Sequence, residues 1–146
     1  MRKLGEHLSG RERYRSLVYG RPFYQSRDDV AGVQTETVIV SDFAALEFSS
    51  VIARFVRTRS LTKEQARVVL ADFDDWSETA CQRVVAERTA ILRADAFLRR
   101  MDMTLRAADA INIVIAEGVG ASLMTFDDKM SAAARVLGLP LIEIAA

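Results

Sequence analysis

From about residue 37 to the end of the chain, short apolar runs alternate with longer segments whose apolar residues recur at helical spacing. The run TVIVS at 37–41 is short and rich in β-branched residues, a composition that favours a buried strand. The segment from Phe43 to about Arg59 has a helical period, and Asp42 is a residue type that caps helices well. The pattern therefore predicts a strand followed directly by a helix.

A second helix is predicted after Thr62. Threonine is a favoured N-cap, and Gln65 three positions later completes the pattern of a capping box, in which each side chain bonds the other residue's backbone N–H. A stripe of apolar residues at helical spacing then follows, formed by Ala66, Val69, Leu70, Phe73 and Trp76. This spacing predicts that one face of the helix is buried.

The remainder of the chain repeats the alternation of strands and helices. The predicted elements are a strand at 81–86, a helix over about 87–101 with Ile91, Ala94, Leu98 and Met101 in register, a helix over about 105–117 stopped by Gly118 and Gly120, a strand at 122–126, a helix over 127–138 and a last short strand at 139–144. Strands that alternate with helices are typical of an α/β fold with a mostly parallel sheet.

The first part of the chain differs from this pattern. Residues 1–32 contain all three tyrosines and many charges, and they show no sustained strand or helix period. We therefore expect an atypical N-terminal segment over 1–35 and a regular domain over 36–146.

Composition narrows the classes of protein that fit. A chain of 146 residues with 50% hydrophobic and 27% charged residues suits one globular domain. The 20 basic and 20 acidic residues cancel, so no global charge indicates a polyanionic partner, although local patches can still bind one.

Two scarce residue types exclude several chemistries. The single cysteine, Cys81, permits no intrachain disulfide, which fits a reducing cytoplasm. The single histidine, His7, makes zinc sites of histidine and cysteine unexpected, and also Ser-His-Asp triads. No apolar run approaches the roughly 20 residues that cross a membrane, and the N-terminus lacks the apolar segment of a secretory signal. If the chain is an enzyme, carboxylates are the expected catalytic groups.

Three acids stand in unusually apolar surroundings. Glu47 lies within FAALEFSSVIA, Asp109 lies within AADAINIVIA, and Asp127 ends the predicted strand at 122–126. An unpaired buried carboxylate costs several kcal/mol, so it should titrate, pair or bind a cation. Three of them could share one Mg²⁺ or Mn²⁺ ion, because hard cations prefer oxygen ligands. Such an ion can activate water and stabilise the displacement of a phosphate ester.

Local structural roles are alternatives for each acid. Glu47 could pair with Arg54 or a distant arginine, Asp109 could form hydrogen bonds within a core, and Asp127 or Asp128 could cap the next helix. We expect Asp127 to be the site acid and Asp128 to be the capping or solvent-facing one.

Two polar residues near these acids are expected to support them. Thr125 lies two residues before Asp127 on the same side of the strand, and Asn112 lies one helical turn after Asp109. Either could hydrogen-bond a neighbouring carboxylate. Together with Asp128, they are expected to surround the metal ligands rather than to bind the cation.

The segments VIVSDFAALEFSSVIARFVR and LRAADAINIVIAEGVGASLMTFDDKMSAAARVLGLPLI together resemble PIN-domain proteins of the VapC toxin type, over about residues 36–144. The resemblance implies a three-layer α/β/α sandwich with a mostly parallel sheet. It also implies a metal-dependent ribonuclease, paired with a cognate antitoxin and often a homodimer. The family's helix glutamate falls on Glu47, the aspartate of its apolar helix on Asp109, and its strand-end aspartate on Asp127. Arginines such as Arg54 or Arg106 would then meet RNA phosphates.

The opening strand of that family, which carries its first acidic ligand, has no counterpart in residues 1–36. The resemblance therefore supplies three acids rather than four, and a PIN-fold protein that keeps only partner or RNA binding is the alternative. One hypothesis for the gap is a shifted reading frame. For residues 8–26, codon choices exist that, shifted forward by one base, spell an opening Tyr-Leu-Asp-Ala-Ser-Ala.

Overall fold

The computed structural model describes residues 38–125 and 127–142, so the atypical segment predicted over 1–35 lies outside the described residues. Its described elements, in chain order, are β1 (Val38–Ser41), α2 (Asp42–Arg57), α3 (Lys63–Thr79), β2 (Cys81–Val84), α4 (Arg88–Arg99), α5 (Ala107–Gly118), β3 (Leu123–Met124), α6 (Asp128–Val136) and β4 (Leu141–Ile142). The predicted order of strands and helices is confirmed, and most of the strands are shorter than predicted.

The strands form two parallel pairs. β1 pairs with β2 from Val38 opposite Cys81 to Ser41 opposite Val84, and β3 pairs with β4 in the same sense. Parallel neighbours need a long crossover, which α2 and α3 supply for the first pair and α6 for the second. The α/β class and the parallel pairing are therefore confirmed. No helix within residues 38–125 and 127–142 is long and apolar enough to span a membrane.

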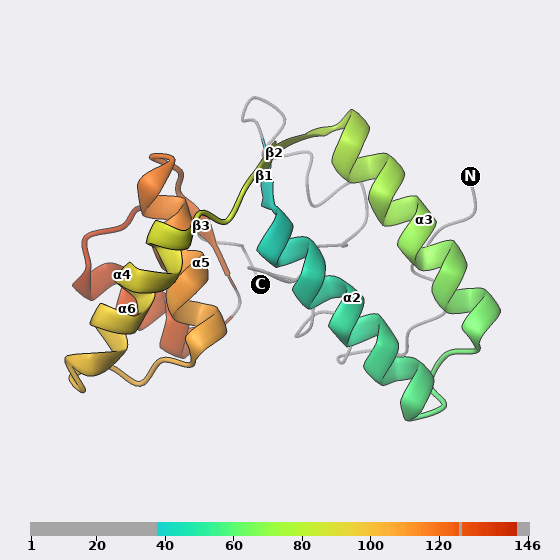
Figure 1. Ribbon diagram of the computed structural model, residues 1–146, viewed down its shortest axis with the longest axis horizontal. Coiled ribbons are helices and arrows are strands. Elements are labelled where there is room, and N and C mark those ends of the chain that lie inside the picture. Colours follow the sequence, from blue (N-terminus) through green and yellow to red (C-terminus); the bar gives the residue numbers. More distant parts are fainter. Residues whose placement is uncertain (1–37, 126, 143–146) are drawn as a thin grey trace.

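Helices lie on both sides of the first strand pair. Figure 1 shows α2 and α3 side by side on one side of the molecule and α4, α5 and α6 on the other. Cys81 packs against the α2–α3 cluster, whereas Val84, three residues later on the same strand, packs against the α4–α5 cluster. Side chains alternate along a strand, so an odd spacing sends these two residues to opposite faces. This layering agrees with the α/β/α arrangement that the sequence implied.

The start of α2 differs from the prediction. Ser41, not Asp42, is the N-cap, and its hydroxyl accepts a hydrogen bond from the N–H of Ala44 at 2.9 Å. Asp42 instead accepts a hydrogen bond from the N–H of Ala86 at 2.7 Å, which ties the helix start to the chain just after β2. Both residue types cap helices, so the sequence did not separate them.

The capping box predicted at the start of α3 is confirmed. The N–H of Gln65 donates to Thr62 Oγ1 at 3.1 Å, and the N–H of Thr62 donates to Gln65 Oε1 at 2.8 Å. Two backbone donors that helix geometry leaves without partners are thereby satisfied.

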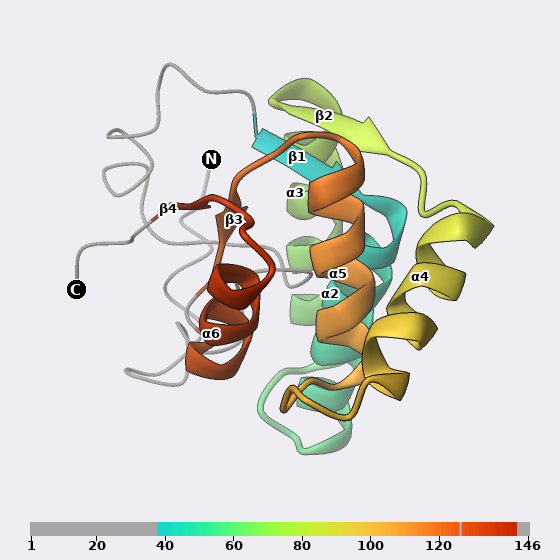
Figure 2. The ribbon, with the colours of Figure 1, turned by 90° about the vertical axis from the view of Figure 1, so that its left-hand side faces the viewer.

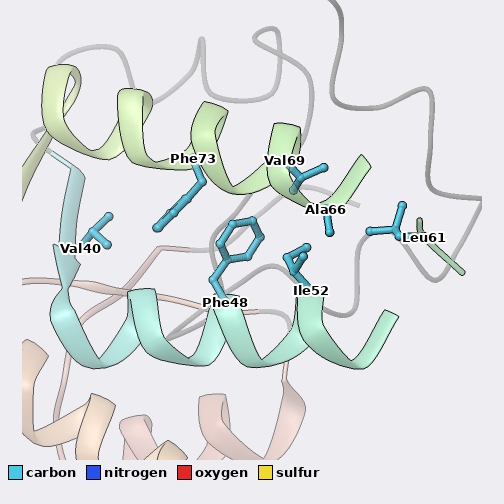
Figure 3. Packing of buried hydrophobic residues seen from close by; sticks show 7 residues of the cluster. All are labelled: Val40, Phe48, Ile52, Leu61, Ala66, Val69 and Phe73. Carbon is cyan, nitrogen blue, oxygen red and sulfur yellow. The ribbon is translucent and has the colours of Figure 1, made fainter. Parts of the chain in front are cut away.

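The two helices α2 and α3 enclose one apolar cluster. Figure 3 shows the side chains of these helices pointing toward one another, with the rings of Phe48 and Phe73 facing across the contact at a centroid distance of 4.4 Å. The buried members of the cluster are Val40, Phe48, Ile52, Leu61, Ala66, Val69 and Phe73. The apolar stripe predicted for α3 therefore forms its buried face.

Helix α5 is the core helix of the other half. It lies between α4 and α6 in Figure 2, and it contributes residues to the apolar clusters that each of them forms. Its residues from Asn112 to Ala116 are all buried, so this helix is covered on most of its surface.

The stripe predicted for α4 is only partly buried. Ala90 and Ala94 pack against α5, whereas Ile91 is 53% exposed and Met101, beyond the end of the helix, is 89% exposed. The small alanine side chains allow close approach of the two helix backbones, which turns Ile91 outward. The prediction that Ile91 and Met101 belong to the buried stripe is wrong.

Candidate functional site

A hydrogen bond between Glu47 on α2 and Asn112 on α5 is the central contact of the candidate site. Asn112 Nδ2 donates to Glu47 Oε2 at 2.7 Å, across 65 positions of sequence. Asn112 is 1% exposed and Glu47 is half-buried. The expectation that Asn112 bonds a carboxylate is confirmed, and the partner is the acid on the facing helix.

The other polar atom of Asn112 has no such partner. In the described part of the chain, Asn112 Oδ1 is a buried side-chain oxygen without a hydrogen-bond partner. The amide cannot be turned round to satisfy it, because its oxygen would then face the Glu47 carboxylate and repel it. A buried acceptor without a partner costs about 1–3 kcal/mol, so a donor or cation at this position would be stabilising.

Asp109 stands at the start of α5, one turn before Asn112. Its Oδ2 accepts a hydrogen bond from the N–H of Arg106 at 3.1 Å, which satisfies a backbone donor of the N-cap residue. A carboxylate at this helix end is also favoured by the helix dipole. Its second carboxylate oxygen is not part of that bond, so a capping role leaves one oxygen for another ligand.

Asp127 follows β3 closely and caps α6. Its Oδ1 accepts hydrogen bonds from the N–H groups of Lys129 at 2.9 Å and Met130 at 3.1 Å. Asp127 is therefore the capping acid. Asp128 is an exposed residue of the first helical turn, which fits the solvent-facing alternative of the expectation that it would be the capping or solvent-facing acid. Thr125 does not donate to a carboxylate in this contact; its Oγ1 accepts from the N–H of Asp127 at 3.0 Å.

A metal ion needs several of these groups at one point. Within residues 38–125 and 127–142, no group of three or more histidine, cysteine, aspartate or glutamate residues is placed to hold a metal ion. Glu47, Asp109 and Asp127 therefore do not form a complete site by themselves. The contact between Glu47 and Asn112 does suit a hard cation, since it combines a carboxylate with the unpartnered oxygen of Asn112. The assignment of all three acids as metal ligands stays a prediction.

Two arginines, Arg54 and Arg106, are expected to meet RNA phosphates. The guanidinium of Arg54 lies over the ring of Phe55, 5.6 Å from its centroid. Arg106 is exposed at the start of α5, three residues before Asp109. Its side chain is therefore accessible to a phosphate next to the Asp109 end of the helix.

One sequence feature marks Asn112 as unusual. It is a polar residue between Ile111 and Ile113 in an otherwise apolar helix, and a buried polar group requires a partner. A cap of α6 by Asp127 or Asp128 was one of the expected alternatives, and the local pattern could not choose between the two adjacent aspartates.

The described residues thus define an α/β protein with parallel strands, in which acids stand at the starts of α5 and α6 and a third acid lies on α2 against α5. The family model of the PIN domain matches residues 16–136, which is most of the chain. The chain belongs to the PIN domain family. PIN-domain proteins are generally nucleases that act on RNA and typically use divalent metals. No curated protein matches the chain.

The match begins at residue 16, inside the atypical segment predicted over 1–35, and so reaches further toward the N-terminus than the resemblance over 36–144. The family is confirmed, and membership of the VapC-type toxins stays a prediction.

Proposed function

We propose that this chain is a metal-dependent endoribonuclease and the toxin component of a toxin–antitoxin pair. Membership of the PIN family supports nuclease chemistry on RNA. The observation that carries the proposal within the chain is the part-buried contact of Glu47 with Asn112, which brings the α2 acid to the helix whose first turn contains Asp109. In the proposal, Glu47, Asp109 and Asp127 hold Mg²⁺ or Mn²⁺, with Thr125, Asn112 and Asp128 around them.

The chemistry follows from the proposed ligands. A bound divalent cation would activate water for attack on an RNA phosphodiester and would offset the charge that develops on the phosphate. The chain's own part is to hold carboxylates where that cation binds and to present arginines to the backbone phosphates. Arg106, exposed beside Asp109, is the proposed phosphate contact.

The decisive experiment is RNA cleavage by the purified chain in Mg²⁺ or Mn²⁺, compared with the same reaction in EDTA. The proposal expects cleavage that requires the metal and is lost in Asp109→Asn. Asparagine can still accept the hydrogen bond from Arg106, so this variant should fold. Cleavage that persists in EDTA or in Asp109→Asn would contradict the proposal.

The second candidate is a PIN-fold protein that retains partner or RNA binding without efficient cleavage. It is favoured by the absence, among the described residues, of a group of three acids placed to hold a metal. RNA binding by the clean wild-type protein without metal-dependent cleavage would select it. In both cases we propose a cytoplasmic protein that binds a cognate antitoxin and forms a homodimer, which co-purification and light scattering would test.

We further propose an atypical segment over 1–35 ahead of a PIN-like domain over 36–146, with residues 1–32 the product of a shifted frame. The family match from residue 16 overlaps this segment and weighs against the hypothesis. The nucleotide sequence decides this: without a Tyr-Leu-Asp motif in the shifted frame, the hypothesis fails.

A further inference from the structure

The two polar atoms of the buried Asn112 amide have different surroundings. Its Nδ2 donates to Glu47 Oε2 at 2.7 Å, while its Oδ1 is buried without a partner in the described part of the chain. Helix α5 places the residue among buried apolar side chains, where water is scarce and an unused acceptor is costly. An apolar residue at this position would avoid the cost of a buried acceptor without a partner. The presence of an amide therefore indicates a functional role.

We propose that Asn112 is a positioning residue and an oxygen ligand for the divalent cation of this site. Its N–H group holds the Glu47 carboxylate in one orientation, and its carbonyl oxygen faces the cation, either directly or through a water of its hydration shell. The inference rests on the proposed function, because it assumes that a cation binds beside Glu47.

Three physical arguments support this role. Amide and carboxylate oxygens are the ligands that Mg²⁺ and Mn²⁺ prefer. A ligand carboxylate is commonly oriented by a hydrogen-bond donor in the surrounding layer of residues. A cation would also give a partner to Oδ1, which the hydrogen bond from Nδ2 to Glu47 leaves unsatisfied.

The test compares binding of Mn²⁺ and thermal stability in four full-length proteins: wild type, Glu47→Gln, Asn112→Leu and Asn112→Asp. Calorimetric titration and the bound Mn²⁺ signal in electron paramagnetic resonance report on metal without requiring RNA cleavage. Asn112→Leu keeps the number and branching of the side-chain heavy atoms and removes both polar atoms. We expect it to lower Mn²⁺ affinity by about 10- to 100-fold, the usual effect of losing a residue that supports a metal ligand.

Asn112→Asp gives a second, opposite signature. It keeps an oxygen toward the cation but places a carboxylate against the Glu47 carboxylate, so like charges repel in a buried site. We expect its melting temperature to fall in EDTA and to recover on addition of Mn²⁺ by more than that of the wild type. A side chain with a purely structural role would lower the melting temperature to the same extent with and without Mn²⁺.

Gln65→Glu is the matched control, because it makes the same amide-to-acid exchange in the capping box of α3. Gln65 accepts a hydrogen bond from the N–H of Thr62, which a glutamate does equally well. We expect Mn²⁺ to raise its melting temperature by the same amount as it raises that of the wild type.

The outcomes separate this inference from the proposed function. If wild type binds Mn²⁺, Glu47→Gln weakens the binding and both Asn112 variants behave as the wild type does, the role of Asn112 is overturned and the metal site stands. If wild type and all variants bind Mn²⁺ equally weakly and RNA is not cleaved, the proposed nuclease and the inference both fail.

Discussion

Asn112 on α5 donates a 2.7 Å hydrogen bond to Glu47 on α2, and this contact joins the two helical halves of the molecule. Asn112 is almost fully buried and Glu47 is half-buried, so solvent screens the bond less than it screens the surface ion pairs. The fully buried residues form separate apolar clusters, one between α2 and α3 and others around α5, and Phe43 of α2 also packs against the α4–α5 cluster. The contact therefore contributes to the packing of α2 against α5 and also holds Glu47, one of the acids of the candidate site.

A double-mutant cycle with Glu47→Ala and Asn112→Ala measures the strength of this link. Hydrogen bonds to charged groups contribute about 1.5–3 kcal/mol, and we expect a coupling free energy of that order in chemical denaturation. Additive effects of the two substitutions, with no coupling, would show that the bond contributes nothing to folding.

Two substitutions at Asp127 separate its capping role from its proposed metal role. Asparagine caps helices about as well as aspartate, so Asp127→Asn should lose less than about 1 kcal/mol of unfolding free energy, mainly from the helix dipole. Asp127→Ala removes the acceptor for the N–H groups of Lys129 and Met130 and should lose about 1–2 kcal/mol. If Asp127 is a metal ligand, both variants lose cleavage alike. Full cleavage by Asp127→Asn would contradict the metal role and show that Asp127 acts only as the cap of α6.

The capping box at the start of α3 should be a measurable contributor to stability. Thr62→Ala removes the acceptor for the N–H of Gln65, and we expect a loss of about 1 kcal/mol in urea denaturation. Thr79→Ala, an exposed threonine at the other end of the same helix, serves as the control and should change stability by less than about 0.5 kcal/mol. Equal losses in the two variants would contradict the cap assignment.

Met101 adopts a left-handed backbone conformation after α4, with φ of 57°, although it is 89% exposed. This conformation costs a residue with a Cβ about 1–2 kcal/mol, and glycine avoids that cost while losing some conformational entropy. We expect Met101→Gly to raise the unfolding free energy by about 0.5–1 kcal/mol. Met101→Ala retains the Cβ and should not gain; a glycine variant no more stable than the alanine variant would refute the argument.

The Cys81 thiol links stability to alkaline pH. Burial raises its pKa from the ordinary value of 9.0 to about 11, and the nearby Arg83 acts in the opposite direction. The folded state therefore retains the proton longer than the unfolded state. The thiol's contribution to the free energy of unfolding is complete below pH 9 and is lost as pH rises from about 9 to about 11.

Denaturation of wild type and Cys81→Ala at pH 8 and pH 10 checks this, because the wild type should lose more stability between the two. At pH 9 the folded protein should carry a thiolate fraction roughly fifty-fold lower than the unfolded chain and react correspondingly slowly with a disulfide reagent. Equal reaction rates in the folded and denatured protein would contradict the raised pKa.

The sequence determined the order of elements well because each is set by local pattern. The stripe from Ala66 to Phe73 is buried as its spacing predicts, and Thr62 and Gln65 form the expected box. Which side of α4 is covered was not predictable, since helical period does not distinguish Ala90 and Ala94 from Ile91 without knowledge of the neighbouring helix. Contact with α5 decided it.

The acids of the candidate site were identified by their apolar surroundings, but their local roles were not. Asp127 has an extended backbone conformation, with φ of −85° and ψ of 114°, which makes it rather than Asp128 the N-cap. Adjacent identical residues carry no sequence signal for that choice. The facing of Glu47 and Asn112 depends on how α2 and α5 pack, which the sequence pattern leaves open.

The parallel register of β1 and β2 has a consequence for synthesis of the chain. Val38 pairs with Cys81, so β1 leaves the ribosome well before the strand that completes its backbone hydrogen bonds. Closing a loop of this length is entropically costly, and docking of α2 on α3 shortens it before the strands meet. We therefore expect the helical hairpin to form during translation and the strand pair only after β2 has emerged. Until then the free edge of β1 can pair with other chains, and a chaperone that covers it would protect the nascent chain from aggregation.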